Sequence, residues 1–252
     1  MTTEAHRYQA PPALLDGRNI LVTGAGDGIG RAAAECFATH GATVVLLGRT
    51  QAKLESCYDA IVASGAPQPV IQVLDLARAT ESDFAALAGQ LGAELGCLHG
   101  LLHNAALLGP RTPLEQYPLE QWREVMKVNV EAAFVLTRAL LPALMAAPEA
   151  SVLFSSSGVG RRGRAYWGAY AVSKFAVEGL SQVLADELQN TTRIRVNCIN
   201  PGATNTTMRR TAYPAEPPQR NPSPAAIMPS YLYLMGPASA GVSGRSLDAQ
   251  PG

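Results

Sequence analysis

Hydrophobic and polar residues along the chain form two alternating kinds of segment. Short apolar runs rich in β-branched residues predict six strands, at residues 19–23, 43–47, 70–74, 100–103, 151–155 and 194–199. Between them, alanine, leucine and charged residues recur at helical spacing and predict helices at residues 30–39, 52–63, 122–145 and 170–188. This alternation indicates an α/β fold, a Rossmann-type doubly wound parallel sheet with helices on both faces. Functional residues are therefore expected beyond the carboxyl ends of the strands.

The two ends of the chain depart from this pattern. Residues 1–16 carry charges and two adjacent prolines but no apolar run, and we interpret them as a loose leader before a single domain at residues 17–252. Six prolines between residues 214 and 229 exclude long helices and predict a mobile connection at about residues 206–228. A short helix at residues 225–235 and a seventh strand at residues 245–249 are expected to follow.

Composition limits the kinds of partner. The 20 basic and 20 acidic residues give a net charge of zero, so no general attraction for nucleic acid or an anionic membrane is expected, and the partner should be a small molecule. No secretion signal or run of about 20 apolar residues is evident, which predicts a cytoplasmic protein. The four cysteines lack the close spacing of a zinc site, so no metal is expected.

A glycine-rich turn follows the first predicted strand and leads into a helix. Its sequence is Gly24-Ala25-Gly26-Asp27-Gly28-Ile29-Gly30. Glycines let the backbone approach a ligand closely, and the free amides at a helix start attract a pyrophosphate. The turn therefore predicts a dinucleotide site, with a tight turn that binds no ligand as the alternative. The glycine spacing differs from the fingerprint of long-chain dinucleotide folds.

The residues after the second and third strands bear on which dinucleotide binds. NAD-binding folds usually carry an acid after the second strand, but here Arg49 stands at that place and Lys53 follows one helical turn later. A guanidinium there is suited to a 2′-phosphate, which favours NADP(H), with NAD(H) as the alternative. Asp75 ends the third strand, where it is equally suited to bind the adenine amino group or to cap the next turn.

A tyrosine and a lysine four residues apart are the strongest catalytic candidates. Helical spacing places Tyr170 and Lys174 on one face, where an ammonium is expected to lower the pKa of the phenol toward the range of an acid/base catalyst. Ser157, after the fifth strand, is placed to hold a substrate carbonyl. Asn129 is polar within an apolar helix and needs a partner, either backbone or a water that relays protons.

Together these motifs resemble the short-chain dehydrogenase/reductase family over nearly the whole chain. Tyr170-Ala171-Val172-Ser173-Lys174 matches the family's Tyr-x-x-x-Lys motif, and with Ser157 and Asn129 it completes the catalytic tetrad that the resemblance implies. His103-Asn104-Ala105-Ala106 resembles the family's Asn-Asn-Ala-Gly element, from which His103 and Ala106 depart. We interpret His103 as a packed histidine and not as a proton carrier. Residues 201–206 resemble the motif on the nicotinamide side of the cofactor.

The resemblance implies a set of cofactor contacts drawn from these motifs. They are Gly24, Asp27, Gly28, Ile29, Gly30, Arg49, Asp75, Leu76, Asn104, Ala105, Tyr170, Lys174, Pro201, Gly202, Thr204 and Thr206.

The implied activity is hydride transfer between NADP(H) and a carbonyl or secondary alcohol, with Tyr170 as the general acid/base. The alternatives are an NADP(H)-binding redox sensor with little chemistry, and an epimerase or dehydratase of the same fold without net oxidation. The resemblance also implies a homodimer or homotetramer, and a substrate lid at about residues 206–228. Further stretches resemble a bacterial subgroup of oxidoreductases that gives no indication of the substrate.

One loop allows two interpretations. Arg161, Arg162 and Arg164 lie between Ser157 and Tyr170. They could attract an acidic substrate, or they could form a solvated or subunit-facing loop, which we favour.

Overall fold

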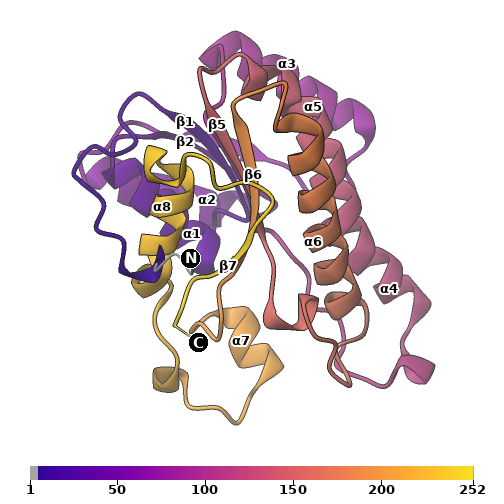
Figure 1. Ribbon diagram of the computed structural model, residues 1–252. Helices are drawn as coiled ribbons and strands as arrows, with labels where there is room; N and C mark the ends of the chain where they lie inside the picture. Colours follow the sequence, from indigo (N-terminus) through magenta and orange to yellow (C-terminus); the bar gives the residue numbers. More distant parts are fainter. Residues whose placement is uncertain (1–4, 252) are drawn as a thin grey trace.

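A single parallel sheet forms the centre of the molecule. The computed structural model describes residues 5–251 (Figure 1). The seven strands lie in the order β3-β2-β1-β4-β5-β6-β7, which confirms the doubly wound sheet and the seventh strand. Their bounds are β1 Asn19–Thr23, β2 Thr43–Gly48, β3 Val70–Val73, β4 Gly100–His103, β5 Ala150–Ser155, β6 Ile194–Asn200 and β7 Ser246–Asp248. The order reverses between β1 and β4, so the carboxyl ends of these strands border the crevice where such sheets bind ligands.

Helices cover both faces of the sheet, as predicted. α1 (Gly28–Thr39), α2 (Gln51–Ala63) and α8 (Met228–Met235) pack in one core with Ile20 and Val22 of β1. α3 (Glu81–Leu95), α5 (Ala132–Met145) and α6 (Gly168–Leu188) pack in a second core with Leu21. Successive residues of β1 thus point to opposite faces, which is why residues 20–22 are all apolar.

The helix predicted at residues 122–145 is longer and is interrupted by a wider turn. α4 (Leu119–Met126) continues through the π-helical turn Lys127–Glu131 into α5. By length and mean hydropathy (1.4) the stretch Leu119–Met145 resembles a membrane span, and 44% of its most apolar window is buried inside the fold. Its apolar residues include Leu136, Leu140 and Leu144, which pack in the second core. Packing against the sheet therefore accounts for much of this hydropathy.

Residues 5–16 pack against the domain, unlike the loose leader that we expected at residues 1–16. Of residues 1–16, the structure describes residues 5–16, and these lie against the body of the domain. Ala5 and Leu15 are buried in the first core, and the Tyr8 ring contacts Tyr233 of α8 with 5.6 Å between centroids. The prolines keep the segment out of regular structure, but its apolar side chains still complete the core.

The proline-rich stretch also contains more structure than its sequence indicates. α7 (Thr207–Ala212) follows β6 and is succeeded by the short turns Pro218–Arg220 and Pro224–Ile227, and Figure 1 shows α7 beyond the end of the sheet. Thr206 starts α7 by accepting a hydrogen bond from the Arg209 amide at 3.1 Å.

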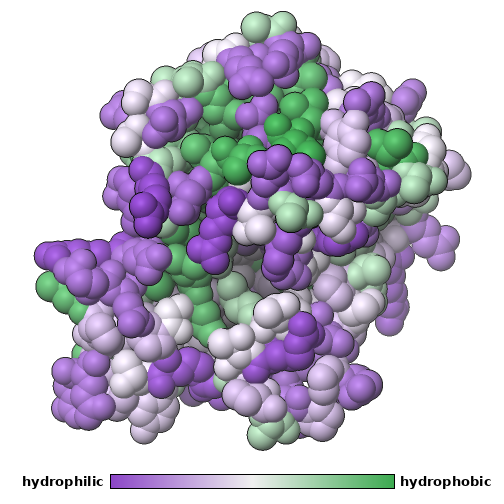
Figure 2. Space-filling model, turned by 180° about the vertical axis from the view of Figure 1, so that it is seen from behind, coloured by the Kyte–Doolittle hydropathy of each residue, from purple (hydrophilic) through white to green (hydrophobic). Residues whose placement is uncertain are grey.

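On the opposite side from the view of Figure 1, the surface is mostly hydrophilic, and it is hollowed near its middle beside hydrophobic residues (Figure 2).

Candidate active site

A cleft of about 450 Å³ lies at the carboxyl ends of the strands. Most of the predicted cofactor residues line it, namely Gly24, Asp27, Gly28, Ile29, Arg49, Asp75, Leu76, Asn104, Ala105, Tyr170, Lys174, Pro201 and Thr206. Gly30, Gly202 and Thr204 are not on its wall. Thr204 is buried, and its hydroxyl donates to the Pro201 carbonyl at 3.2 Å, so it shapes the loop from behind.

The glycine-rich turn is held in a fixed shape by the end of β1. The Thr23 hydroxyl oxygen accepts hydrogen bonds from the amides of Asn104 at 2.9 Å and Ala105 at 3.0 Å, which joins the turn to the residues after β4. Gly24 has a φ of +69°, and a Cβ there would lie 3.0 Å from the Ala105 Cα. α1 begins at Gly28 inside the cleft, so its free amides are available to an anion.

Charged groups lie at the end of the cleft formed by β2 and β3. Arg49 is exposed, and within residues 5–251 its side chain has no hydrogen-bond or ion-pair partner. Lys53 does not reinforce it as expected, because its ammonium is 2.7 Å from the Asp27 carboxylate, and this hydrogen bond lowers the pKa of Asp27. Asp75 accepts a hydrogen bond from the Ala77 amide at 3.0 Å, so it caps the following turn while still lining the cleft.

Tyr170 and Lys174 are both buried on α6 at the cleft wall. The Lys174 ammonium donates to the Ser155 carbonyl at 2.7 Å and lies 5.4 Å from the centre of the Tyr170 ring. Burial raises the pKa of Tyr170 to about 12, although a hydrogen bond with Ser157 acts to lower it. Burial also lowers the pKa of Lys174 to about 8. The expected lowering of the tyrosine pKa is thus not seen in the protein alone, because the effect of burial outweighs that of the hydrogen bond with Ser157.

Ser157 and Asn129 flank this pair from different elements. Ser157 begins a short turn, Gly158–Gly160, and its hydroxyl accepts a hydrogen bond from the Val159 amide at 3.4 Å. The Asn129 carboxamide accepts from the Leu107 amide at 2.7 Å and donates to the Leu107 carbonyl at 3.0 Å and the Ser173 hydroxyl at 2.9 Å. Both Asn129 amide hydrogens are therefore engaged, and the side chain holds the segment after β4 against α6.

The His103 side chain is buried on the face of the sheet that carries the second core. Its Nε2 lies 2.7 Å from the Thr137 hydroxyl, and its ring stacks on Phe154 with 4.7 Å between centroids. Burial lowers the pKa of His103 to about 3, so the imidazole is neutral near pH 7. This geometry supports its interpretation as a packing residue. Ala106, the other departure from the family pattern, lies on the cleft wall.

The neutral state of His103 predicts a pH dependence of stability. The unfolded histidine has a pKa of about 6.5, so between about pH 6.5 and 3 only the unfolded chain takes up this proton, and stability is lost as the pH falls. The free energy of unfolding of the wild type, measured with urea, should therefore fall by up to about 1.4 kcal/mol per pH unit below pH 6.5 relative to that of His103→Phe. Parallel curves for the two proteins from pH 7.5 to 4.5 would show that His103 is protonated in the folded state.

An apolar cluster next to Tyr170 was not foreseen from the sequence. Trp167, Tyr170 and Ala212 are buried in it together, and Met208 and Tyr213 pack against them. The Arg111 guanidinium lies over the rings of both Trp167 and Tyr213, 4.7 Å and 4.8 Å from their centres. α7 and the residue after it thus lie directly against the tyrosine helix. No local sequence pattern identifies these contacts, because they join residues of α6, α7 and the loop that contains Arg111, which are far apart in the sequence.

The fold and the site together define a dinucleotide-binding oxidoreductase of the α/β class, and comparison with known proteins identifies its family. The family model for short chain dehydrogenases matches residues 18–217. The chain is 51% identical to the Escherichia coli K12 protein named uncharacterized oxidoreductase YciK, over 97% of this chain and 96% of that protein.

Two solved structures of short-chain dehydrogenases are also closely similar. The enzyme from Shigella flexneri 2a complexed with NADP has 51% identity and a TM-score of 0.93, over 96% of this chain and 100% of that chain. The enzyme from Escherichia coli CFT073 complexed with NADPH has 52% identity and a TM-score of 0.92, with the same coverage. The chain belongs to the short-chain dehydrogenase/reductase family and is an oxidoreductase of that family.

Proposed function

We propose that the protein transfers a hydride between NADP(H) and a carbonyl or secondary alcohol, with Tyr170 as general acid/base. The observation that carries this proposal is the buried Tyr170–Lys174 pair on the wall of a cleft that begins at the glycine-rich turn. When bound, the nicotinamide supplies or accepts the hydride. The chain has to supply the remaining parts, which are a proton at the substrate oxygen and a fixed orientation of both reactants.

Each member of the tetrad has a part in this proposal that its contacts support. The raised pKa keeps Tyr170 protonated, so its hydroxyl donates a proton to the carbonyl oxygen during reduction. The Lys174 ammonium, anchored at the Ser155 carbonyl, would hold the nicotinamide ribose beside the phenol. Ser157 orients the substrate oxygen, and Asn129 fixes the segment after β4 that borders the cofactor. Asn129 therefore acts by positioning and does not itself carry a proton through its side chain.

NADP(H) is the proposed cofactor. Two close relatives have been crystallised with NADP or NADPH, and the exposed Arg49 side chain on the cleft, which has no polar partner within residues 5–251, is suited to bind a 2′-phosphate. Arg49→Ala should weaken NADPH binding about tenfold or more, the usual cost of a lost hydrogen bond to a charged group. NADH binding should stay within about twofold, since NADH has no 2′-phosphate. Calorimetric titration of both cofactors tests this, and an equal loss for both would reject the role.

The reaction class is tested with a panel of aldehydes, ketones, quinones and secondary alcohols and both cofactors. Stoichiometric change in nicotinamide absorbance during turnover is expected for an oxidoreductase. Product formed without net absorbance change would indicate an epimerase or dehydratase. Cofactor binding without product across the panel would favour a redox sensor. The same panel reports the preferred direction and the substrate class.

Residues 206–228 are the proposed substrate lid. α7 and Tyr213 pack against Trp167, one helical turn from Tyr170 in the sequence. Arg111 stacks on Tyr213 and also donates to the Ala212 carbonyl, so the lid is fastened beside the site. A lid held by one small cluster of this kind can open for substrate and close during the reaction.

A homodimer or homotetramer is proposed from exposed apolar side chains on α5 and α6. Phe134, Val172, Phe175 and Val183 are each more than 40% exposed. Exposed apolar residues on neighbouring helices are typical of subunit contacts, which bury them against a second copy. Light scattering of the purified protein measures the stoichiometry.

A further inference from the structure

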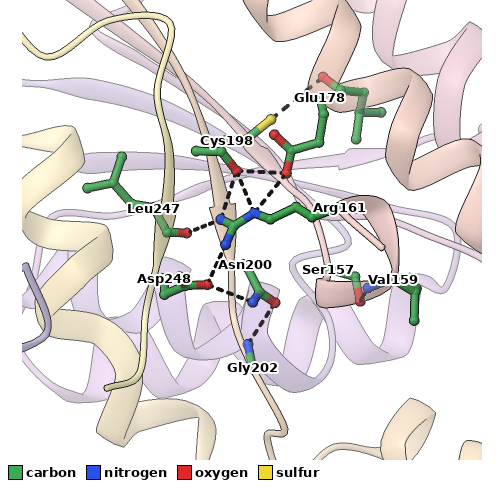
Figure 3. A network of polar contacts seen from close by, with 11 residues as sticks. Ser157, Val159, Arg161, Glu178, Cys198, Asn200, Gly202, Leu247 and Asp248 are labelled. Carbon is green, nitrogen blue, oxygen red and sulfur yellow. Dashed lines mark hydrogen bonds and ion pairs between the residues drawn. The ribbon is translucent and has the colours of Figure 1, made fainter. Parts of the chain in front are cut away.

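Arg161 belongs to a network of polar contacts that joins β7, α6 and the end of β6, and Ser157 lies to one side of it (Figure 3). Arg161 directly follows the turn Gly158–Gly160, which Ser157 begins. The guanidinium donates to the Asp248 carboxylate at 2.7 Å, to the Leu247 carbonyl at 3.0 Å and to the Ser246 hydroxyl at 2.8 Å. These three acceptors all lie on β7. The end of the serine turn is therefore fastened to the last strand of the sheet.

The same network reaches the tyrosine helix through Glu178. Glu178 lies on α6 one turn after Lys174, and its side chain is only 10% exposed. The Ser246 hydroxyl donates to its carboxylate at 2.7 Å, and Nε of Arg161 is 3.6 Å from the same oxygen. Figure 3 shows the guanidinium between Glu178 on one side and Leu247 and Asp248 on the other.

A third branch supports the loop that starts at Pro201. The oxygen of Asp248 bound by Arg161 also accepts a hydrogen bond from the Asn200 carboxamide at 2.7 Å, and the Asn200 oxygen accepts from the Gly202 amide at 3.1 Å. Next to Asp248, the Gln250 carboxamide donates to the Pro201 carbonyl at 2.7 Å. Pro201 lines the cleft, so this branch ends at the cofactor side of the loop.

We propose that Arg161 is a positioning residue that couples the serine turn, the tyrosine helix and the Pro201 loop, and thereby sets the affinity for the nicotinamide half of the cofactor. This inference rests on the proposed function. A guanidinium offers five donors in a fixed plane, so it can hold several groups at once, which a lysine cannot do with the same geometry. Paired with Asp248 and close to Glu178, Arg161 is also not an open site for an acidic substrate.

The expected effect is local. The Arg161 side chain is 32% exposed and that of Asp248 is 50% exposed, and ion pairs with this much solvent contribute little to global stability. Their loss should instead loosen the orientation of the loop on which they converge. A loss of affinity for the nicotinamide end of the cofactor alone therefore distinguishes a positioning role from general damage to the fold.

The test compares two ligands in calorimetric titrations of Arg161→Met. NADPH contains the nicotinamide, whereas 2′-phosphoadenosine 5′-diphosphoribose has the same adenosine end and lacks it. The Kd for NADPH should rise about tenfold, while the Kd for the shorter ligand should stay within about twofold. Arg161→Lys should be intermediate. Arg162→Met is the matched control, because the Arg162 side chain is exposed and has no polar partner within the described residues, and the variant should bind both ligands as the wild type does.

Gln250→Ala provides a second variant on the opposite side of the loop and should show the same selective loss, since it removes the hydrogen bond to the Pro201 carbonyl. Unchanged NADPH binding in Arg161→Met would overturn the inference, whatever the result for Gln250→Ala. So would an equal loss for the two ligands, which marks unfolding or general disorder. Failure of the wild type to bind NADPH at all would instead reject the proposed function.

Discussion

Tyr170→Phe should lose most turnover and keep its cofactor. The variant removes one hydroxyl from a ring that is only 9% exposed, so the packing with Trp167 should persist. General acid/base catalysis accounts for about 10²- to 10⁴-fold in rate, and kcat should fall within that range. The Kd for NADPH should change less than about twofold, because the loss is confined to the transition state. Steady-state kinetics and titration of the same preparation measure both quantities.

The matched control for this variant is Tyr166→Phe. Tyr166 lies four residues earlier, is 56% exposed and does not line the cleft, so its hydroxyl should be dispensable for turnover. Wild-type turnover in Tyr170→Phe would remove Tyr170 from the mechanism. An equal loss in Tyr166→Phe would indicate that the loop, and not the acid/base group, had been disturbed.

Gly30→Ala should abolish NADPH binding and destabilise the fold. A Cβ at Gly30 would lie 2.2 Å from the Gly24 carbonyl oxygen and 2.6 Å from the Asn104 side-chain nitrogen, so the glycine-rich turn would have to move. Overpacking of this kind costs about 1–3 kcal/mol or more, and here it falls on the backbone that approaches the pyrophosphate. Urea unfolding should show that loss in the free energy of unfolding, and calorimetry should detect no NADPH binding.

Gly89→Ala is the control for this substitution. Gly89 lies inside α3, and a Cβ there would meet nothing within 4 Å. The alanine should stabilise the protein by about 0.5–1 kcal/mol, because glycine is a poor helix former. If Gly30→Ala bound NADPH like the wild type, the turn would be more adaptable than its contacts indicate. The prediction that the shape of this turn is required for cofactor binding would then be wrong.

The sheet and the cleft could be predicted from the sequence because their signals are local. A buried strand such as 19–23 is recognisable from its own residues, and the glycine-rich turn follows it directly. α3 was absent from the predicted helices, since its small residues, including Gly89 and Gly92, weaken the helical pattern. The stronger signal there was the capping box of Thr80 and Asp83 at its start.

The electrostatics of the site could not be predicted in the same way. That Lys53 pairs with Asp27 depends on how α2 packs beside the glycine-rich turn, which places residues 26 positions apart at 2.7 Å. The pKa of Tyr170 depends on how completely the fold excludes water from it, and spacing along a helix carries no such information. For the same reason the partners of Arg161 on β7 became evident only once the chain was folded.

The packing of residues 5–16 limits how the protein can be shortened. Leu15 is fully buried in the first core, and Tyr8 covers part of Tyr233. A chain trimmed to begin at β1 would expose the apolar side of α8 to water and leave a gap where Leu15 had been. Such an exposed patch promotes self-association, so a trimmed protein should be prone to precipitate during purification even though every cleft residue is retained.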